Sequence, residues 1–143
     1  MSFRRINMHQ ATLWRNIMSQ PGTETHILLI DDDPEILESM RIALEANGYR
    51  VTTARDGSQG LALAERQQFD LMILDMMMPK RSGFLVLETL RQLEKRPIRI
   101  IMVTANEGNR HREYAEQLGV DEYIRKPFPM DVLIEAIKRV MSK

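Results

Sequence analysis

Four apolar segments of the chain are each followed by side chains that suit phosphoryl chemistry. The first precedes the acidic run Asp31-Asp32-Asp33, and the others end at or precede Asp75, Thr104 and Lys126. Magnesium prefers oxygen ligands such as these carboxylates. A carboxylate can also act as a nucleophile and form an acyl phosphate. Lysine and threonine can hold the remaining phosphoryl oxygens, so the set indicates a metal-assisted phosphoryl site.

Strand-like and helix-like segments alternate from His26 onward, and this alternation determines where the polar side chains lie. The predicted strands are Ile27–Ile30, Tyr49–Thr53, Leu71–Leu74, Ile98–Val103 and Val120–Ile124. With five helical segments between and after them, they predict an α/β fold: a doubly wound five-stranded parallel sheet with helices on both faces. Ligands of such sheets bind at the carboxyl ends of the strands. The sequence therefore brings the carboxylates, the hydroxyl and the ammonium to one edge.

Two helices are especially clear. Asp33 followed by Pro34 predicts the start of the first, and Asn47-Gly48 predicts its end. Its apolar stripe comprises Ile36, Leu37, Met40, Ala43 and Leu44. The last helix places its apolar stripe at Val132, Leu133, Ala136, Ile137, Val140 and Met141, so this segment is needed by the core and is no DNA-recognition helix.

Each polar residue also has a purely structural interpretation. Asp33 before Pro34 fits a helix cap, Thr104 a strand-end hydroxyl, and Lys126 a solvated surface charge. Capping explains Asp75 poorly, because the sequence Met-Met-Met-Pro that follows it begins no helix. The joint placement of all these groups at the ends of four strands favours the functional interpretation.

Composition limits the classes of protein. The chain has 143 residues, enough for one domain, and 43% of them are hydrophobic. It has no cysteine, which excludes disulfides, thiolate metal sites and cysteine nucleophiles. Its net charge of zero argues against non-specific nucleic-acid binding, and no apolar run is long enough to span a membrane. Because the N-terminal residues contain no apolar h-region, a secretory signal is not expected. A cytoplasmic protein is expected.

Residues 1–25 lie outside the alternating pattern and are expected to be an N-terminal extension that is flexible or forms a short helix. Residues 1–23 carry three arginines and no acid, so this part is positively charged and the remainder is negative. Leu13, Trp14, Ile17 and Met18 could form a short amphipathic helix, and the alternatives of a docking or dimerisation helix and a start-site artefact stay open.

At these residues the chain closely resembles the receiver domain of bacterial two-component response regulators. The matching stretches are ILLIDDDPEI (27–36), DLMILDMMMPKRSG (70–83), IIMVTA (100–105) and DEYIRKPF (121–128). They occur in order and with the spacing of the family. The resemblance implies a flavodoxin-like receiver fold over residues 26–143.

The resemblance also implies a role for each site residue. Asp75 would be the phosphoacceptor and would receive its phosphoryl group from a phosphohistidine. Asp31, Asp32, Asp75 and the backbone carbonyl of Met77 would bind Mg²⁺. Lys126 would pair with the phosphoryl group, and its peptide bond to the following proline would be cis. No organic cofactor is implied.

Switching is a further implication of the resemblance. Thr104 would move toward the phosphoryl group, and Tyr123 would change its rotamer with it. This movement would alter the face formed by the fourth helix, fifth strand and fifth helix of the fold. Met77 and Asn106 occupy positions that affect phosphoryl lifetime in the family, and the bulk of Met77 predicts a long-lived phosphorylated state.

The implied partners are a sensor histidine kinase or a histidine phosphotransfer protein, and a downstream protein target. No direct nucleic-acid or membrane partner is expected, and a homodimer is an open option. The domain is expected to be no enzyme beyond its own phosphoryl uptake and autodephosphorylation. Both a stand-alone regulator and a receiver excised from a longer protein are compatible with the sequence.

Two rival functions remain. Haloacid-dehalogenase-type phosphatases use a first-strand Asp with a second acid two residues on, and Asp31 with Asp33 meets that spacing. They need another acidic pair after the lysine, however, and only Asp131 and Glu135 follow Lys126, both in the predicted last helix. The second rival is a degenerate receiver that only binds proteins, which the intact set of site residues argues against.

Overall fold

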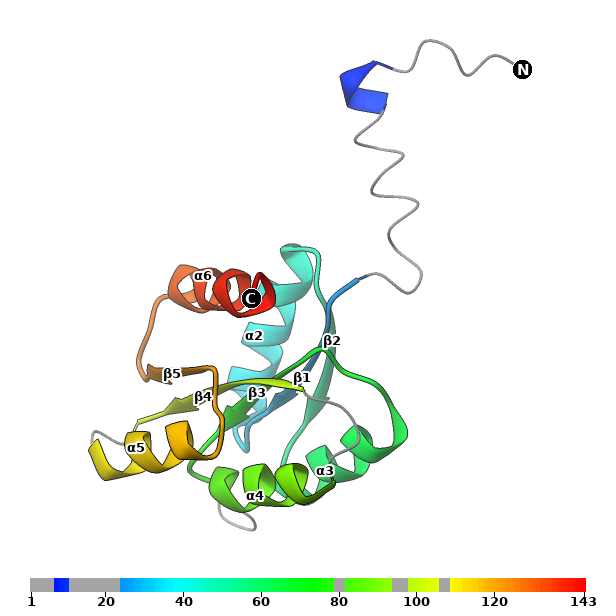
Figure 1. Ribbon diagram of the computed structural model, residues 1–143. Coiled ribbons are helices and arrows are strands. Elements are labelled where there is room, and N and C mark those ends of the chain that lie inside the picture. Colours follow the sequence, from blue (N-terminus) through cyan, green and yellow to red (C-terminus); the bar gives the residue numbers. More distant parts are fainter. Residues whose placement is uncertain (1–6, 11–23, 79–81, 94–97, 106–108) are drawn as a thin grey trace.

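Five short apolar segments form a parallel sheet in the order β2-β1-β3-β4-β5 (Figure 1). The computed structural model describes residues 7–10, 24–78, 82–93, 98–105 and 109–143. The strands are β1 (His26–Ile30), β2 (Arg50–Ala54), β3 (Leu71–Asp75), β4 (Arg99–Thr104) and β5 (Glu122–Arg125). All five predicted strands are confirmed, and the boundaries differ from the prediction by no more than about two residues, the usual uncertainty of strand and helix ends.

Five helices follow the strands and cover both faces of the sheet. They are α2 (Pro34–Ala46), α3 (Gly57–Arg66), α4 (Gly83–Leu93), α5 (Asn109–Gln117) and α6 (Met130–Met141). Helices α2 and α6 lie on one face, and α3, α4 and α5 lie on the other (Figure 1). The predicted doubly wound α/β fold is therefore confirmed. Among the described residues, none of these helices has the length and apolar character needed to cross a bilayer.

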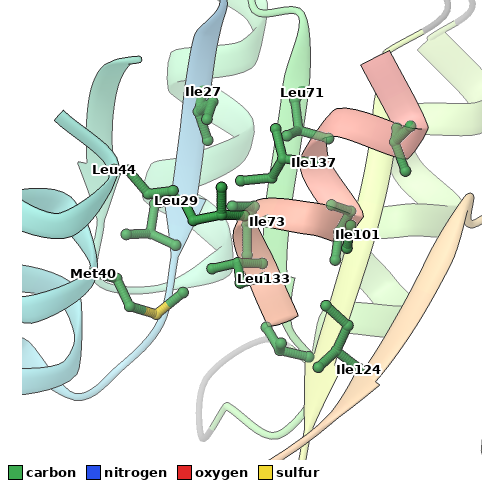
Figure 2. Packing of buried hydrophobic residues seen from close by; sticks show 14 of the residues in the cluster. Ile27, Leu29, Met40, Leu44, Leu71, Ile73, Ile101, Ile124, Leu133 and Ile137 are labelled. Carbon is green, nitrogen blue, oxygen red and sulfur yellow. The ribbon is translucent and has the colours of Figure 1, made fainter. Parts of the chain in front are cut away.

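Alternate residues of the central strands supply two separate cores. Ile27, Leu29, Leu71 and Ile73 pack beneath α2 and α6 (Figure 2). The intervening residues of the same strands, such as Leu28 and Met72, point to the opposite core under α3, α4 and α5. Because both faces are covered, β3 before Asp75 and β1 after His26 are apolar at every position, as expected for buried parallel strands.

Helix α2 begins and ends as its sequence predicts. The Asp33 side chain accepts hydrogen bonds from the backbone N–H groups of Glu35 at 2.9 Å and Ile36 at 3.3 Å. Pro34 occupies the first turn, where its missing N–H costs no helical hydrogen bond. Gly48 ends the helix at φ +90°, a conformation that other residues adopt with strain. The structural interpretation of Asp33 as a cap is thus confirmed.

The predicted apolar stripe of α6 is wrong at two positions. Val132 is 42% exposed, whereas Ile134, which the stripe omitted, is buried with Leu133, Ala136, Ile137 and Val140. The buried face of α6 is wider than the predicted stripe because the helix packs against both the sheet and α2.

The strand order places a topological switch at the ends of β1 and β3. From β1 the chain continues to β2 on one side, and the next strand, β3, pairs with β1 on the other side. The connections therefore leave the carboxyl ends of β1 and β3 in opposite directions, which opens a crevice there. Asp31 directly follows β1, and Asp75 is the last residue of β3.

Gly83, at the start of α4, packs against the backbone at the end of β3. A Cβ at this position would lie 2.7 Å from the Asp75 carbonyl oxygen and 2.8 Å from the Met76 Cα. At Gly60, in contrast, a Cβ would meet the movable end of the Ile30 side chain at 2.3 Å.

We expect Gly83→Ala to lower the free energy of unfolding by about 2–3 kcal/mol, because the backbone of β3 cannot yield as a side chain can. Gly60→Ala is the matched control and should cost less than about 1 kcal/mol, since alanine also favours the helix. Urea denaturation of both variants measures the difference. Equal costs would show that the backbone contact of Gly83 carries no special weight.

Part of the sequence predictions concerns residues outside the described ranges. Leu13, Trp14, Ile17, Met18 and Asn106 belong to this group, so the expectations for them stay predictions. Within residues 7–10, Met8–Gln10 is helical, and the side chains of Asn7 and Gln10 each accept a hydrogen bond from the backbone N–H of the other.

Candidate functional site

Three carboxylates meet at the ends of β1 and β3. Asp31 is 2% exposed and Asp75 4% exposed, while Asp32 faces solvent. One oxygen from each of these three residues lies within 4.8 Å of the others. Such a group suits a divalent cation with oxygen ligands, because the ion offsets the mutual repulsion of the acids. Asp33 stays outside this group because its side chain caps α2.

Lys126 joins the cluster from the loop after β5. Its Nζ donates a hydrogen bond to Asp31 Oδ2 at 2.9 Å and lies 3.7 Å from Asp75 Oδ1. The side chain is 20% exposed, so the ion pair is shielded from most of the solvent. The interpretation of Lys126 as a solvated surface charge is therefore wrong. The alternating pattern predicted this convergence because β4 and β5 extend the sheet beside β3.

The electrostatics of Asp75 are unfavourable for its charged form. Burial and the neighbouring charge of Asp31 raise the pKa of Asp75 to about 6. Lys126 and the hydrogen bond from the Met77 backbone N–H, at 3.2 Å, oppose this rise without cancelling it. Asp75 is therefore a more basic carboxylate than an exposed aspartate, and it gains from a cation in the site.

The Lys126 ammonium keeps its charge at neutral pH. Burial alone would lower its pKa, but the hydrogen bond to Asp31 and the charges of Asp75, Asp31 and Asp32 outweigh burial and raise it. A fixed positive charge 3.7 Å from an Asp75 oxygen is placed to stabilise negative charge that develops on a group bound there.

Thr104 and Tyr123 lie on the neighbouring strands β4 and β5. Thr104 is fully buried at the end of β4. The Tyr123 hydroxyl is within hydrogen-bond range of Thr104 and lies 3.9 Å from the Met76 sulfur. Burial raises the pKa of Tyr123, so its phenol is neutral at physiological pH. The two residues lie on β4, which pairs with the Asp75 strand β3, and on the edge strand β5.

One feature beside the cluster, the peptide bond after Lys126, matches the family resemblance. The Lys126–Pro127 peptide bond is cis. The Met77 side chain, two residues after Asp75, is 57% exposed, whereas its neighbours Met76 and Met78 are buried. Residues 76–78, which follow Asp75 directly, are not helical, and helix capping therefore does not explain Asp75.

A hollow of about 600 Å³ adjoins the cluster on the side of α2. Its lining contains charged side chains, among them Lys126 and Asp33, together with apolar ones. The residues that line it include Ile36, Met40, Pro127, Phe128 and Met130.

Sequence reasoning missed one residue beside the site. Arg112, on α5, places its guanidinium 5.9 Å from the centre of the Tyr123 ring. In sequence it belongs to the charged segment Arg110–Glu113, which is typical of a solvated helix face. No local pattern distinguishes it, because the contact depends on how α5 packs against β5.

The arrangement favours phosphoryl acceptance over phosphatase chemistry. Asp131 and Glu135, the only acids after Lys126, lie on α6 and are exposed. Among the described residues, the only group of three or more acids placed to hold a metal ion together is Asp31, Asp32 and Asp75. The later acidic pair that the phosphatase hypothesis needs is therefore not part of the site.

Comparison with known proteins gives a consistent result. Residues 27–138 match the family model of the response regulator receiver domain. Similar proteins include the transcriptional regulatory protein CpxR of Escherichia coli, 38% identical over 117 residues. Another is the response regulator SaeR of Staphylococcus aureus, 32% identical over 119 residues. These alignments cover 82% and 83% of this chain but 49% and 51% of the relatives, so the chain spans about half their length.

Solved structures share the fold. A CheY-like response regulator receiver domain protein from Methanospirillum hungatei is 34% identical with a TM-score of 0.77, and the match covers 81% of this chain and 92% of that one. TrrA from Thermotoga maritima, solved in complex with Mg²⁺-BeF, is also 34% identical. Its TM-score is 0.73, with 81% of this chain and 98% of that chain covered.

Proposed function

The chain belongs to the family of response regulator receiver domains, and from this premise we propose that Asp75 is its phosphoacceptor. The observation that carries the proposal is the burial of Asp75 beside Asp31, with the Lys126 ammonium 3.7 Å away. A buried carboxylate with a raised pKa and a neighbouring fixed cation is suited to nucleophilic attack on phosphorus.

The residues of the site have distinct roles in this proposal. An oxygen of Asp75 attacks the phosphorus of a phosphohistidine, a P–O bond forms, and the P–N bond to the imidazole breaks. Lys126 stabilises the negative charge on the phosphoryl oxygens, and the Thr104 hydroxyl donates to one of them. The reaction therefore depends mainly on positioning and charge.

Mg²⁺ is the metal that we propose for the carboxylate cluster. Asp31, Asp32, Asp75 and the Met77 backbone carbonyl would hold it. The raised pKa of Asp75 reflects burial and repulsion from Asp31 without enough positive charge nearby, and a bound cation would offset this repulsion. The structure of TrrA, in addition, was solved in complex with Mg²⁺-BeF. When bound, the ion would supply positive charge that offsets charge on the phosphoryl oxygens.

Switching and partners complete the proposal. Phosphorylation adds about −1.5 to −2 charges, which can bias Thr104 and Tyr123 between two arrangements. The affected surface would be that of α5, β5 and α6, where a downstream protein binds.

The donor would be a sensor histidine kinase or a histidine phosphotransfer protein in the cytoplasm. Residues 26–143 would form the receiver domain, residues 1–25 an extension, and Met77 would prolong the phosphorylated state.

Incubation with acetyl phosphate and Mg²⁺, followed by intact mass measurement, tests the proposal. We expect the mass to increase by one phosphoryl group and the increase to be lost when EDTA replaces Mg²⁺. Glu113→Gln, on the exposed face of α5, should behave as the parent. A parent chain that never gains mass would support the rival of a degenerate receiver.

The affinity for Mg²⁺ should depend on pH because a proton competes with the ion for Asp75. With a pKa of about 6, most Asp75 is ionised at about pH 7.5 and about a tenth of it at about pH 5. We therefore expect binding to be about tenfold weaker at the lower pH, as measured by titration calorimetry. In Asp75→Asn this dependence should be much smaller. An equal dependence in both proteins would assign the proton to another group.

A further inference from the structure

Helix α5 has a small hydrophobic interface with the rest of the domain. Among its described side chains only Ala115 is fully buried. The other contacts come from polar and aromatic groups. His111 and Tyr114 pack on the Phe84 ring of α4, and the Tyr114 hydroxyl donates to Glu88. An element with so few buried apolar contacts is comparatively easy to move.

Arg112 connects α5 to β5 through an aromatic ring. Its guanidinium carbon lies 5.9 Å from the centre of the Tyr123 ring, within the range of a cation–π interaction. On its other side, Arg112 Nε donates to Glu116 Oε1 at 3.2 Å, one turn along the helix. The carboxylate therefore helps to keep the guanidinium over the ring.

The hydroxyl end of Tyr123 reaches the interior of the site. It is within hydrogen-bond range of Thr104 and 3.9 Å from the Met76 sulfur, and Met76 directly follows Asp75. Tyr123 thus contacts the end of the phosphoacceptor strand with its hydroxyl and Arg112 with its ring. Any movement of the ring changes both contacts.

We propose that Arg112 is a positioning residue for Tyr123, which holds the ring toward Thr104 and couples its position to helix α5. The guanidinium favours the inward position because it gains the face of the ring only there. When phosphorylation changes the surroundings of Thr104, a movement of Tyr123 would also change the contact between its ring and Arg112, and with it the packing of α5 on the domain. This coupling rests on the proposed function, in which Asp75 accepts the phosphoryl group.

The size of the effect follows from the exposure of the contact. Cation–π interactions at exposed sites change a two-state equilibrium by roughly two- to fivefold. Loss of Arg112 should therefore increase, by about this factor, the ratio of molecules with the Tyr123 ring turned toward solvent to those with the ring turned toward Thr104. Lysine at this position keeps the charge but lacks the planar guanidinium, and it should restore the effect only in part.

The test uses 3-fluorotyrosine incorporated at position 123 of the full chain and ¹⁹F NMR. Arg112→Ala is compared with Arg110→Ala, which removes the same charge from an exposed position of the same helix. Without phosphodonor, we expect Arg112→Ala to shift the resonance toward the solvent-exposed value and increase its response to D₂O. Arg110→Ala should leave it unchanged, Arg112→Lys should be intermediate, and the melting temperatures of the two alanine variants should agree within about 2 °C.

The outcomes separate the two proposals. An unchanged resonance in Arg112→Ala, or equal shifts in both alanine variants, would overturn the role of Arg112. The comparison is made without phosphodonor, so it does not depend on phosphoryl uptake. Acetyl phosphate and Mg²⁺ are added afterwards, as a separate test of phosphoryl uptake. If the intact mass shows no phosphoryl adduct, the proposed function fails, while the result without phosphodonor still stands.

Discussion

Asp75→Asn is expected to unfold at a higher temperature than the parent in the absence of Mg²⁺, although it should take up no phosphoryl group. Burial and Asp31 raise the pKa of Asp75 from 3.8 to about 6, so its ionised form destabilises the folded chain at neutral pH. Each pKa unit corresponds to about 1.4 kcal/mol, which sets the gain from the neutral amide at about 1–3 kcal/mol. The amide oxygen can still accept the hydrogen bond from the Met77 N–H.

The stability difference between Asp75→Asn and the parent should depend on pH. The folded-state pKa lies above the unfolded value, so the folded chain binds the proton more tightly and is relatively stabilised by acid. The destabilising effect of Asp75 is complete above about pH 6 and disappears as the pH falls toward 3.8. The advantage of Asp75→Asn should shrink over the same range. Thermal melts of both proteins measure it, with Glu113→Gln as the control for loss of an exposed charge. A lower melting temperature for Asp75→Asn at neutral pH would contradict this account.

Lys126→Met should have the opposite effect on stability. The variant keeps most of the side-chain volume but leaves Asp31 and Asp75 buried without their nearby cation. Removing one partner of a buried ion pair costs about 3–5 kcal/mol. Because Asp75 can bind a proton, we expect a loss of about 2–4 kcal/mol in the free energy of unfolding. Phosphoryl uptake should slow by at least about a hundredfold, as on removal of other preorganised donors.

The chain offers a matched control for this variant. Lys138→Met breaks an exposed pair with Glu135 at 3.5 Å and should change stability by less than about 0.5 kcal/mol. Adding Asp75→Asn to Lys126→Met should recover part of the loss, because fewer buried charges remain. Urea denaturation of the parent, the two single variants and the double variant measures this coupling. Strict additivity of the two changes would show that Lys126 and Asp75 do not interact.

The sequence predicted the fold well where one physical signal was sufficient. The apolar segments before Asp31 and Asp75 indicated strands covered on both faces, and the caps at Asp33 and Gly48 determined the ends of α2. The predicted burial was wrong for Val132 and Ile134 in α6, because a helical pattern of apolar residues gives the periodicity of the buried face but not its width. That width depends on which neighbours pack against α6.

For the site, the sequence predicted which residues come together but not the distances between them. Parallel strands bring their carboxyl ends to one edge, so the convergence of Asp31, Asp75 and Lys126 was predictable from order alone. The ion pair between Asp31 and Lys126, and the raised pKa of Asp75, depend on distances that the sequence does not contain. The contact of Arg112 with Tyr123 likewise depends on how α5 is oriented on the sheet.

The most direct test of the central claim locates the phosphoryl group within the chain. After uptake from acetyl phosphate with Mg²⁺, borohydride reduces an aspartyl phosphate to homoserine with loss of phosphate, and peptide mass spectrometry then identifies the altered residue. The account predicts homoserine at position 75 and none in Asp75→Asn. Homoserine at position 31 or 32, or an adduct that persists unchanged in Asp75→Asn, would contradict it.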